Sequence, residues 1–229
     1  MTKEIDWLPT LTGEMLFCGV LGKALLTFPD RQWLQSLAYD SIFEEPPFAL
    51  HQPDMQAGLV LLKEWSRVNR VEMSDEVFHA LKADYTRLFI GPGQVLAPPW
   101  ESVFVKDGRM IFQEVTLHVR EWYLRYNLQP VRLYIEPDDH IGLELTFLAH
   151  LAGLGLAALK KQDDVEFAAV VEAQRGFLSE HVLRWALIWC DQVGVYCRTN
   201  FYRGIALVVR GALAEMAAIF ETETSVVDR

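Results

Sequence analysis

Hydrophobic residues recur along most of this chain at spacings of three and four residues, which places them on one side of an α-helix. The spacing predicts helices over residues 10–28, 31–39 and 55–68. A further helix is expected to follow Ser74, a residue type suited to the N-cap, and to continue to Phe89. Few stretches alternate strictly between apolar and polar residues, so the pattern favours an all-α fold.

The second half of the chain continues the helical pattern. Helices are predicted over residues 112–126, 165–189 and 201–220, and the tail beyond them is expected to fray. Residues 141–159 are apolar on two sides, which is typical of the central helix of a bundle. This segment could nearly span a bilayer, but a charge such as Glu144 costs about 2.5–3.5 kcal/mol at the centre of a membrane. We therefore expect a helix buried by protein and no stable membrane insertion.

Proline and glycine residues mark the breaks between these segments. The Gly-Pro-Gly sequence at 91–93 ends one helix, and the stretch up to Pro99 cannot be regular because prolines lack a backbone donor. A second break lies just before the long apolar helix, and we interpret it as a hinge. The predicted architecture is a single multi-helix bundle, with an N-terminal helical part over residues 1–134 and a C-terminal helical part over residues 135–229.

Composition narrows the classes of function. Of the 229 residues, 51% are apolar and 23% are charged, which is ordinary for a globular protein. With 21 basic and 31 acidic residues the formal net charge is −10, so we expect no nucleic-acid partner and some attraction for cationic peptides.

Cys18, Cys190 and Cys197 form no Cys-x-x-Cys pair, which favours core thiols in a reducing compartment. The first nine residues lack the apolar stretch of a secretory signal, so a cytoplasmic location is expected.

Residues able to carry catalysis are sparse. One group resembles a metal site, namely Asp138, Asp139, His140 and Glu144, of which the last two share a helix face. A helical metal-dependent enzyme using Asp139, His140 and Glu144 is therefore the alternative hypothesis, although no His-Glu-x-x-His sequence is present. Phosphate-binding loops and nucleophile elbows are also missing from the sequence. The main expectation is a protein that is not an enzyme, with no catalytic residue, no metal and no cofactor.

An aromatic and proline-rich segment is more informative. Pro99 and the proline before it place a stiff turn ahead of Trp100 and Glu101. Prolines restrict a loop and aromatic rings offer large contact areas with few rotatable bonds, which suits a binding pocket. A loop packed onto the core explains the same pattern equally well. Further along, Phe177, His181 and Trp185 recur at every fourth residue, and such a stripe is more often core than site.

Four sequence motifs resemble those of the TorD/DmsD/NarJ-type chaperones that mature redox enzymes. They are Tyr85-x-x-Leu88-Phe89-x-Gly-Pro, Ala-Pro-Pro99-Trp100-Glu101-Ser-Val, Glu136-Pro137-Asp138-Asp139-His140, and Phe177-x3-His181-x3-Trp185 followed by Phe201-Tyr202. The motifs occur in the family's order, and residues before about 70 match in helical character alone. One departure is Arg184, where relatives often carry proline.

The resemblance implies an all-helical, TorD-like cytoplasmic chaperone for a molybdenum-cofactor oxidoreductase. Its partners would be the twin-arginine leader peptide and the apo form of a reductase subunit, held back from export until the cofactor is in place. In the family the Glu-Pro-Asp-Asp-His motif lies in the hinge, which would give Glu136 and Pro137 a structural role. The resemblance implies a structural role for the later motif residues Phe177, His181 and Trp185 as well. Some members form domain-swapped homodimers, and the sequence leaves the oligomeric state open.

The chemistry of a twin-arginine leader suggests which residues would bind it. Such a leader is a cationic pair followed by an apolar stretch, and an apolar groove would take the latter. Carboxylates would pair with the guanidinium groups, and His140 would orient a carboxylate or bond to the leader backbone. The expected peptide-binding residues are Tyr85, Leu88, Phe89, Pro99, Trp100, Glu101, Asp138, Asp139 and His140.

Overall fold

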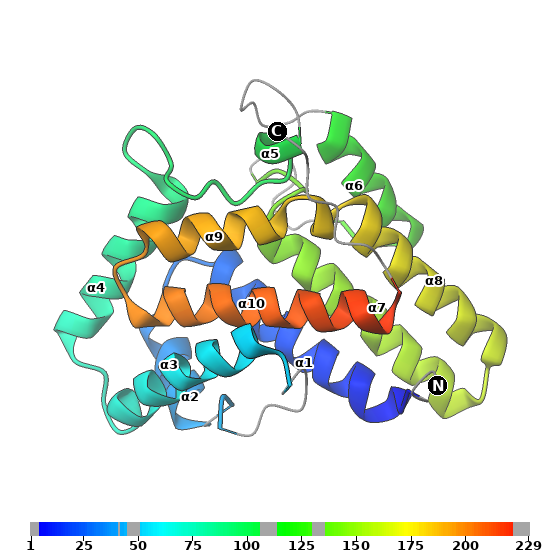
Figure 1. The fold of residues 1–229 in the computed structure, drawn as a ribbon, viewed down its shortest axis with the longest axis horizontal. Helices are drawn as coiled ribbons and strands as arrows, with labels where there is room; N and C mark the ends of the chain where they lie inside the picture. The colour runs from blue at the N-terminus through cyan, green and yellow to red at the C-terminus, as the bar shows by residue number, and fades with distance from the viewer. Residues whose placement is uncertain (1–4, 41, 45–50, 106–113, 130–135, 222–229) are drawn as a thin grey trace. The chain divides into compact units, whose positions relative to one another are not determined.

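A computed structural model describes residues 5–40, 42–44, 51–105, 114–129 and 136–221 (Figure 1). Within these ranges the regular structure is helical, and the pairing of extended residues is confined to an isolated antiparallel bridge between Trp100 and His140. The predicted all-α fold is thus confirmed. The tail beyond residue 221 lies outside the described residues, as do the first two residues of the hinge predicted near 134–137.

Most of the helices begin and end close to the positions that the hydrophobic pattern predicts. In chain order they are α1 (Trp7–Leu26), α2 (Arg31–Tyr39), α3 (Pro53–Asn69), α4 (Asp75–Tyr85), the π-helix η1 (Thr86–Ile90), α5 (Ser102–Val105), α6 (Glu114–Arg125), α7 (Ile141–Lys161), α8 (Asp164–Glu180), the 3₁₀ helix η2 (Val182–Arg184), α9 (Ala186–Tyr196) and α10 (Asn200–Ile219). Ser74 caps α4 as expected, since its side chain accepts a hydrogen bond from the Val77 backbone N–H at 3.2 Å.

The single helix predicted over residues 165–189 is wrong. The chain leaves the helical conformation at His181 (φ −126°, ψ −82°) and again at Trp185 (φ −142°), so α8 and α9 are separate helices joined by η2. His181 and Trp185 therefore do not continue the helix face of Phe177. The break places both side chains where they meet buried carboxylates, and such buried groups are costly when they are left without a hydrogen-bond partner.

The chain folds into two compact units, and each is formed by separate stretches of sequence. The first contains residues 1–26, 99–186 and 216–229, and the second contains residues 27–98 and 187–215. The division that the sequence suggested, between residues 134 and 135, does not coincide with this one. It falls inside the first unit, because helices distant in sequence pack together there.

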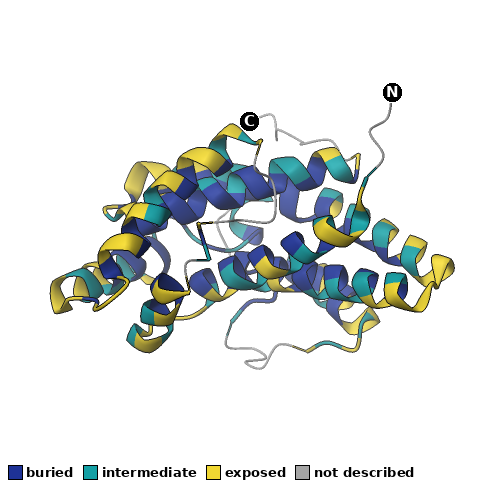
Figure 2. Ribbon diagram, turned by 90° about the horizontal axis from the view of Figure 1, so that it is seen from below, coloured by how far each residue is buried: buried dark blue, intermediate teal, exposed yellow. Residues whose placement is uncertain are grey.

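In the first unit, α1 packs along α7 at very short range. A Cβ atom added to Gly22 of α1 would lie 2.8 Å from the carbonyl oxygen of Gly142, and one added to Gly142 would lie 2.8 Å from that of Gly22. The absence of side chains lets the two backbones approach. Helix α8 also packs against α7, and Figure 2 shows helices that are buried on one side and exposed on the other.

Helix α7 is long and apolar enough to cross a membrane by length and composition, and 61% of that window is buried inside the protein. Its buried residues include Leu145, Leu148 and Leu151, while Lys160 and Lys161 lie in its last turn. This burial agrees with the expected central helix of a bundle.

In the second unit, α3 packs on α10 through another pair of small residues. A Cβ atom on Gly58 would lie 2.8 Å from the Gly204 carbonyl oxygen, and one on Gly211 would lie 2.5 Å from the Met55 backbone nitrogen. Trp65 of α3 also contacts Phe201 of α10, with ring centroids 4.6 Å apart.

Candidate functional site

The Pro-Pro-Trp loop and the Glu-Pro-Asp-Asp-His segment lie side by side in the first unit. The Ile141 N–H donates to the Pro99 carbonyl at 2.9 Å, and the Glu101 N–H donates to the Asp139 carbonyl at 3.0 Å. These bonds flank the bridge between Trp100 and His140. The two motifs are therefore held together by backbone contacts, so the position of each depends on the other.

Trp100 is the most accessible aromatic side chain of this pair of segments. Its indole Nε1–H donates to Glu136 Oε1 at 2.7 Å, and both residues are partly exposed. The imidazole of His140 makes a T-shaped contact with the indole, with ring centroids 6.3 Å apart at 76°. The indole is thus held by a hydrogen bond and a ring contact, while part of its surface remains accessible to solvent.

Beneath this surface, Asp138 and Asp139 are buried and hydrogen-bonded. The Asp139 carboxylate accepts from the Ser102 N–H and from the Thr116 hydroxyl, both at 2.8 Å. The Asp138 carboxylate pairs with Arg120 Nε at 2.5 Å. Burial raises the pKa of Asp138 from its usual value, whereas the Arg120 guanidinium acts to lower it. Both aspartates therefore serve as internal acceptors that tie the motif to neighbouring segments.

His140 begins helix α7 as its N-cap. Its Nδ1 atom accepts the Gly142 N–H at 2.9 Å, which requires a neutral ring with a lone pair on Nδ1. Burial lowers the pKa of His140 from 6.5 to about 3. The N-cap of this helix is thus a neutral imidazole that follows two buried aspartates.

Two further buried carboxylates complete an acidic interior. Glu101 Oε2 lies 2.7 Å from His181 Nδ1, and Glu144 accepts from the indole N–H of Trp185 at 3.1 Å. Burial raises the pKa of Glu144 well above its usual value, and the nearby charges of Glu101 and Asp139 raise it further. For Glu101, burial also raises the pKa, while the contact with His181 acts in the opposite direction.

Three of the expected peptide-binding residues lie in the second unit. Tyr85, Leu88 and Phe89 are buried, at 5%, 0% and 3% exposure. The Phe89 ring stacks near that of Trp189 with centroids 5.9 Å apart, and the Leu88 carbonyl accepts from the Ala97 N–H at 2.9 Å. These residues form an aromatic core that fixes the start of the proline-rich loop.

The helix that carries Tyr85 also supplies a buried carboxylate that the sequence did not single out. Asp84 accepts from the Arg198 N–H at 2.9 Å, from the Thr199 N–H at 2.8 Å and from the Thr199 hydroxyl at 2.8 Å. Arg87, one turn later, pairs with it at 2.7 Å. Asp84 thereby organises the turn between α9 and α10.

Of the nine expected binding residues, Trp100 is the one that is not buried. The other members brought together in the first unit, which are Pro99, Glu101, Asp138, Asp139 and His140, are all buried. Sequence reasoning missed Thr116, Arg120 and Tyr123 of α6, whose side chains reach the Asp-Asp pair. Their spacing of three and four residues is a helix-face signal, but only the fold shows what that face meets.

The alternative metal site at Asp139, His140 and Glu144 is not supported. His140 Nδ1 already accepts the Gly142 N–H, and both Asp139 oxygens are hydrogen-bonded. Within the described ranges, the three-residue group whose ligand atoms converge is a different one, formed by His118, Glu180 and His181.

Comparison with known proteins places these motifs in a family. The sequence profile described as nitrate reductase delta subunit matches residues 51–191. A probable Tat proofreading chaperone DmsD of Haemophilus influenzae is 32% identical over 124 residues, covering 54% of this chain and 54% of that protein. The chaperone protein TorD of Aliivibrio fischeri is 29% identical over 119 residues, or 52% and 54% of the two chains. TorD of Vibrio cholerae is 26% identical over 185 residues, or 76% and 82%.

The alignments thus span about half the length of the first two relatives and most of the third. The matched region contains the Pro-Pro-Trp loop, the Asp-Asp-His segment and His181, which the fold brings together in one unit. Because the family profile covers more than half of the chain, the protein belongs to the nitrate reductase delta subunit family, with the TorD- and DmsD-type chaperones among its relatives.

Proposed function

We propose that this protein is a cytoplasmic chaperone that binds the twin-arginine leader of a molybdenum-cofactor oxidoreductase subunit and assists its maturation before export. Family membership supports this role most strongly, together with relatives named Tat proofreading chaperone and TorD. The partners are the leader peptide and the apo form of the enzyme subunit. Peptide binding of this kind needs no catalytic residue and no cofactor in the chaperone.

Within the first unit, the partly exposed Trp100 and Glu136 offer the contact surface. The indole face would cover part of the apolar stretch of the leader, and the Glu136 carboxylate would pair with a guanidinium group of the arginine pair. The net charge of −10 favours the approach of a cationic peptide. The single observation that carries this assignment is the Trp100–Glu136 contact, which puts an apolar ring and a carboxylate next to each other at an accessible position.

The buried residues would support this surface from below. Pro99, Glu101, Asp138, Asp139 and His140 hold the loop against the start of α7 through the backbone and carboxylate bonds described above. In the second unit, the aromatic core of Tyr85, Leu88 and Phe89 would hold the preceding part of the loop. The leader would then contact few of these side chains directly, and their substitution would act through the position of Trp100.

Titration calorimetry with synthetic twin-arginine leaders tests the proposal. Leaders taken from the chain's own genomic neighbours would identify the client. We expect saturable binding that weakens at least tenfold, or about 1.4 kcal/mol, in Trp100→Ala. Glu136→Gln should weaken binding of the Arg-Arg leader. The same substitution should cause a smaller loss of affinity for a leader in which both arginines are replaced by glutamine.

Glu121→Gln is the matched control, because it removes the same charge from an exposed position on α6 of the same unit. It should leave leader affinity unchanged. Binding by no leader of the panel would overturn the proposed function. Binding that is indifferent to both Trp100→Ala and Glu136→Gln would retain the function and reject the assigned surface.

A further inference from the structure

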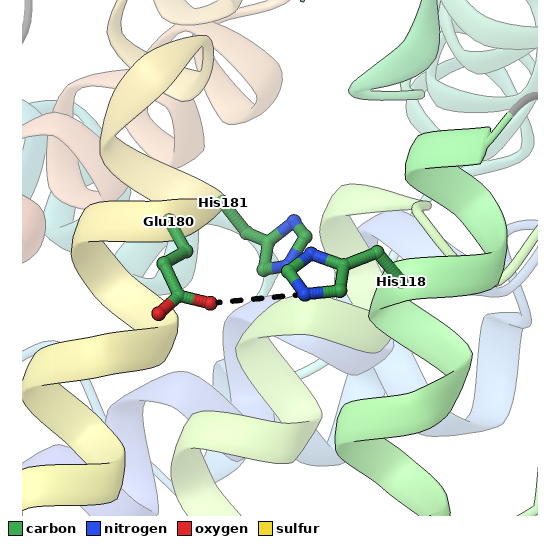
Figure 3. Close-up of side chains that lie close together, drawn as sticks. All are labelled: His118, Glu180 and His181. Atoms are coloured by element: carbon green, nitrogen blue, oxygen red, sulfur yellow. Dashed lines mark ion pairs between the residues drawn. The ribbon is translucent and has the colours of Figure 1, made fainter.

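Two histidines and a glutamate converge within the first unit. His118 lies in the middle of α6, Glu180 is the last residue of α8, and His181 follows it. One ligand atom from each lies within 4.8 Å of the others. His118 Nε2 is 4.0 Å from Glu180 Oε2, and the two imidazole rings are 4.8 Å apart at their centroids (Figure 3).

His181 is the residue that distinguishes this group from an ordinary surface cluster. Its side chain is 2% exposed, and its Nδ1 atom is engaged by Glu101 Oε2 at 2.7 Å. Its Nε2 atom is buried and has no hydrogen-bond partner among the described residues. Buried polar atoms are nearly always paired, so an imidazole nitrogen left in this state suggests a missing ligand.

The contact with Glu101 also prepares His181 for a metal. A carboxylate on Nδ1 favours the tautomer that carries the proton there, which leaves the lone pair on Nε2. Histidine ligands of metal ions commonly donate their second ring N–H to a carboxylate in this way, which orients the ring and makes it a stronger ligand. In Figure 3 the His181 ring faces that of His118, and the Glu180 carboxylate approaches the same place.

His118 and Glu180 supply the accessible part of the group. Their side chains are 45% and 48% exposed, so a cation can reach both from solvent. Ligand atoms around zinc sit about 2.0–2.2 Å from the ion, which brings neighbouring atoms to about 3.3–3.5 Å from each other. The ligand atoms, now within 4.8 Å of one another, would have to move closer by side-chain rotation on metal binding. Trp122 Nε1 donates to Glu180 Oε2 at 3.2 Å and keeps the carboxylate near the histidines.

From this geometry we propose that His118, His181 and Glu180 bind a divalent transition-metal ion of the zinc class, with solvent at the fourth position. Two imidazoles and one carboxylate form a ligand set typical of zinc, and a fourth water ligand completes a tetrahedron. The ion would link α6 to the junction between α8 and η2. The site shares no ligand with the rejected group at Asp139, His140 and Glu144.

The test is titration of the full chain, freed of any histidine tag and of metal, with Zn²⁺ in a calorimeter. We expect one equivalent to bind with a dissociation constant in the micromolar range or below, and a rise in the midpoint of thermal unfolding at saturation. His118→Ala and Glu180→Gln change exposed side chains and should each weaken Zn²⁺ binding at least tenfold. Saturable binding of less than half an equivalent would overturn the proposal.

His79→Ala is the matched control, because it removes an exposed imidazole from α4 in the other unit. It should leave Zn²⁺ affinity and stoichiometry unchanged. The three cysteines are free but buried, so thiol ligands do not compete in the folded protein. If His118→Ala binds Zn²⁺ as tightly as the unmodified chain, or if His79→Ala weakens binding equally, the assigned ligands are wrong.

Discussion

The Nδ1 atom of His181 lies 2.7 Å from the Oε2 atom of Glu101, and both side chains are buried. The two residues are 80 positions apart in the chain, so this contact joins the Pro-Pro-Trp loop to the end of α8. The other Glu101 oxygen, Oε1, has no partner among the described residues. A buried pair of this kind contributes little net stability when intact, but the loss of one member leaves the other without compensation.

We therefore expect Glu101→Ala to lower the free energy of unfolding by about 3–5 kcal/mol. Glu101→Gln keeps an acceptor for the imidazole and should cost less than half of that. Urea unfolding of the full chain measures both. The exposed Glu121→Ala is the reference and should change stability by less than about 0.5 kcal/mol. If Glu101→Ala lowers the free energy of unfolding no more than Glu121→Ala does, the contact with His181 does not stabilise the fold.

Because His140 is buried, the folded chain should lose stability in acid. Its pKa is about 3 in the folded chain against 6.5 normally, because the ring is buried. Between these values the unfolded chain binds a proton that the folded chain does not, so stability falls as the pH drops below about 6.5. From pH 7.5 to pH 5 the contribution of this group falls by about 2 kcal/mol.

His140→Asn isolates this effect, because asparagine is a good N-cap and does not titrate. Urea unfolding across the pH range should show the unmodified chain losing stability relative to the variant as the pH falls. Parallel curves for the two proteins would mean that the His140 ring is protonated without cost in the fold.

The contact between α1 and α7 provides a matched pair of glycine substitutions. A Cβ atom at Gly22 would lie 2.5 Å from Thr146 Oγ1 and 2.8 Å from the Gly142 carbonyl, whereas one at Gly19 meets nothing within 4 Å. Gly22→Ala should therefore destabilise the chain by about 1–3 kcal/mol through overpacking. Gly19→Ala should stabilise it by up to about 1 kcal/mol through helix propensity. Thermal unfolding should show opposite shifts, and shifts of the same sign would contradict the close approach of the two helices.

The positions of most helices could be predicted from local sequence patterns. Periodic apolar residues, the Ser74 cap and the Gly-Pro-Gly break placed most helices to within a few residues, because these signals act within one or two turns. The short helix α5 and the π-helical turn at 86–90 were not foreseen, and the break at His181 was missed. In the last case Phe177, His181 and Trp185 have helical spacing, but contacts with Glu101 and Glu144 override it.

The division into units could not be predicted from local signals. The sequence suggested one boundary near residue 134. Each of the two compact units instead combines segments from both sides of that position. Helix α10 begins in one unit and ends in the other, and α1 belongs with α7 and α8. Periodicity tells which face of a helix is apolar, but it does not tell which helix will cover that face.

By itself, the sequence determined that the chain is all-helical, that its core helix lies over residues 141–159, and which motifs carry the family resemblance. These features depend on neighbouring residues and on residue identity. The tertiary structure alone decided that Asp138, Asp139 and His140 are internal supports, that Trp100 stays accessible, and that His118 meets His181. Such relationships arise from packing between residues far apart in the chain, where burial and hydrogen bonding, not spacing, set the position of each side chain.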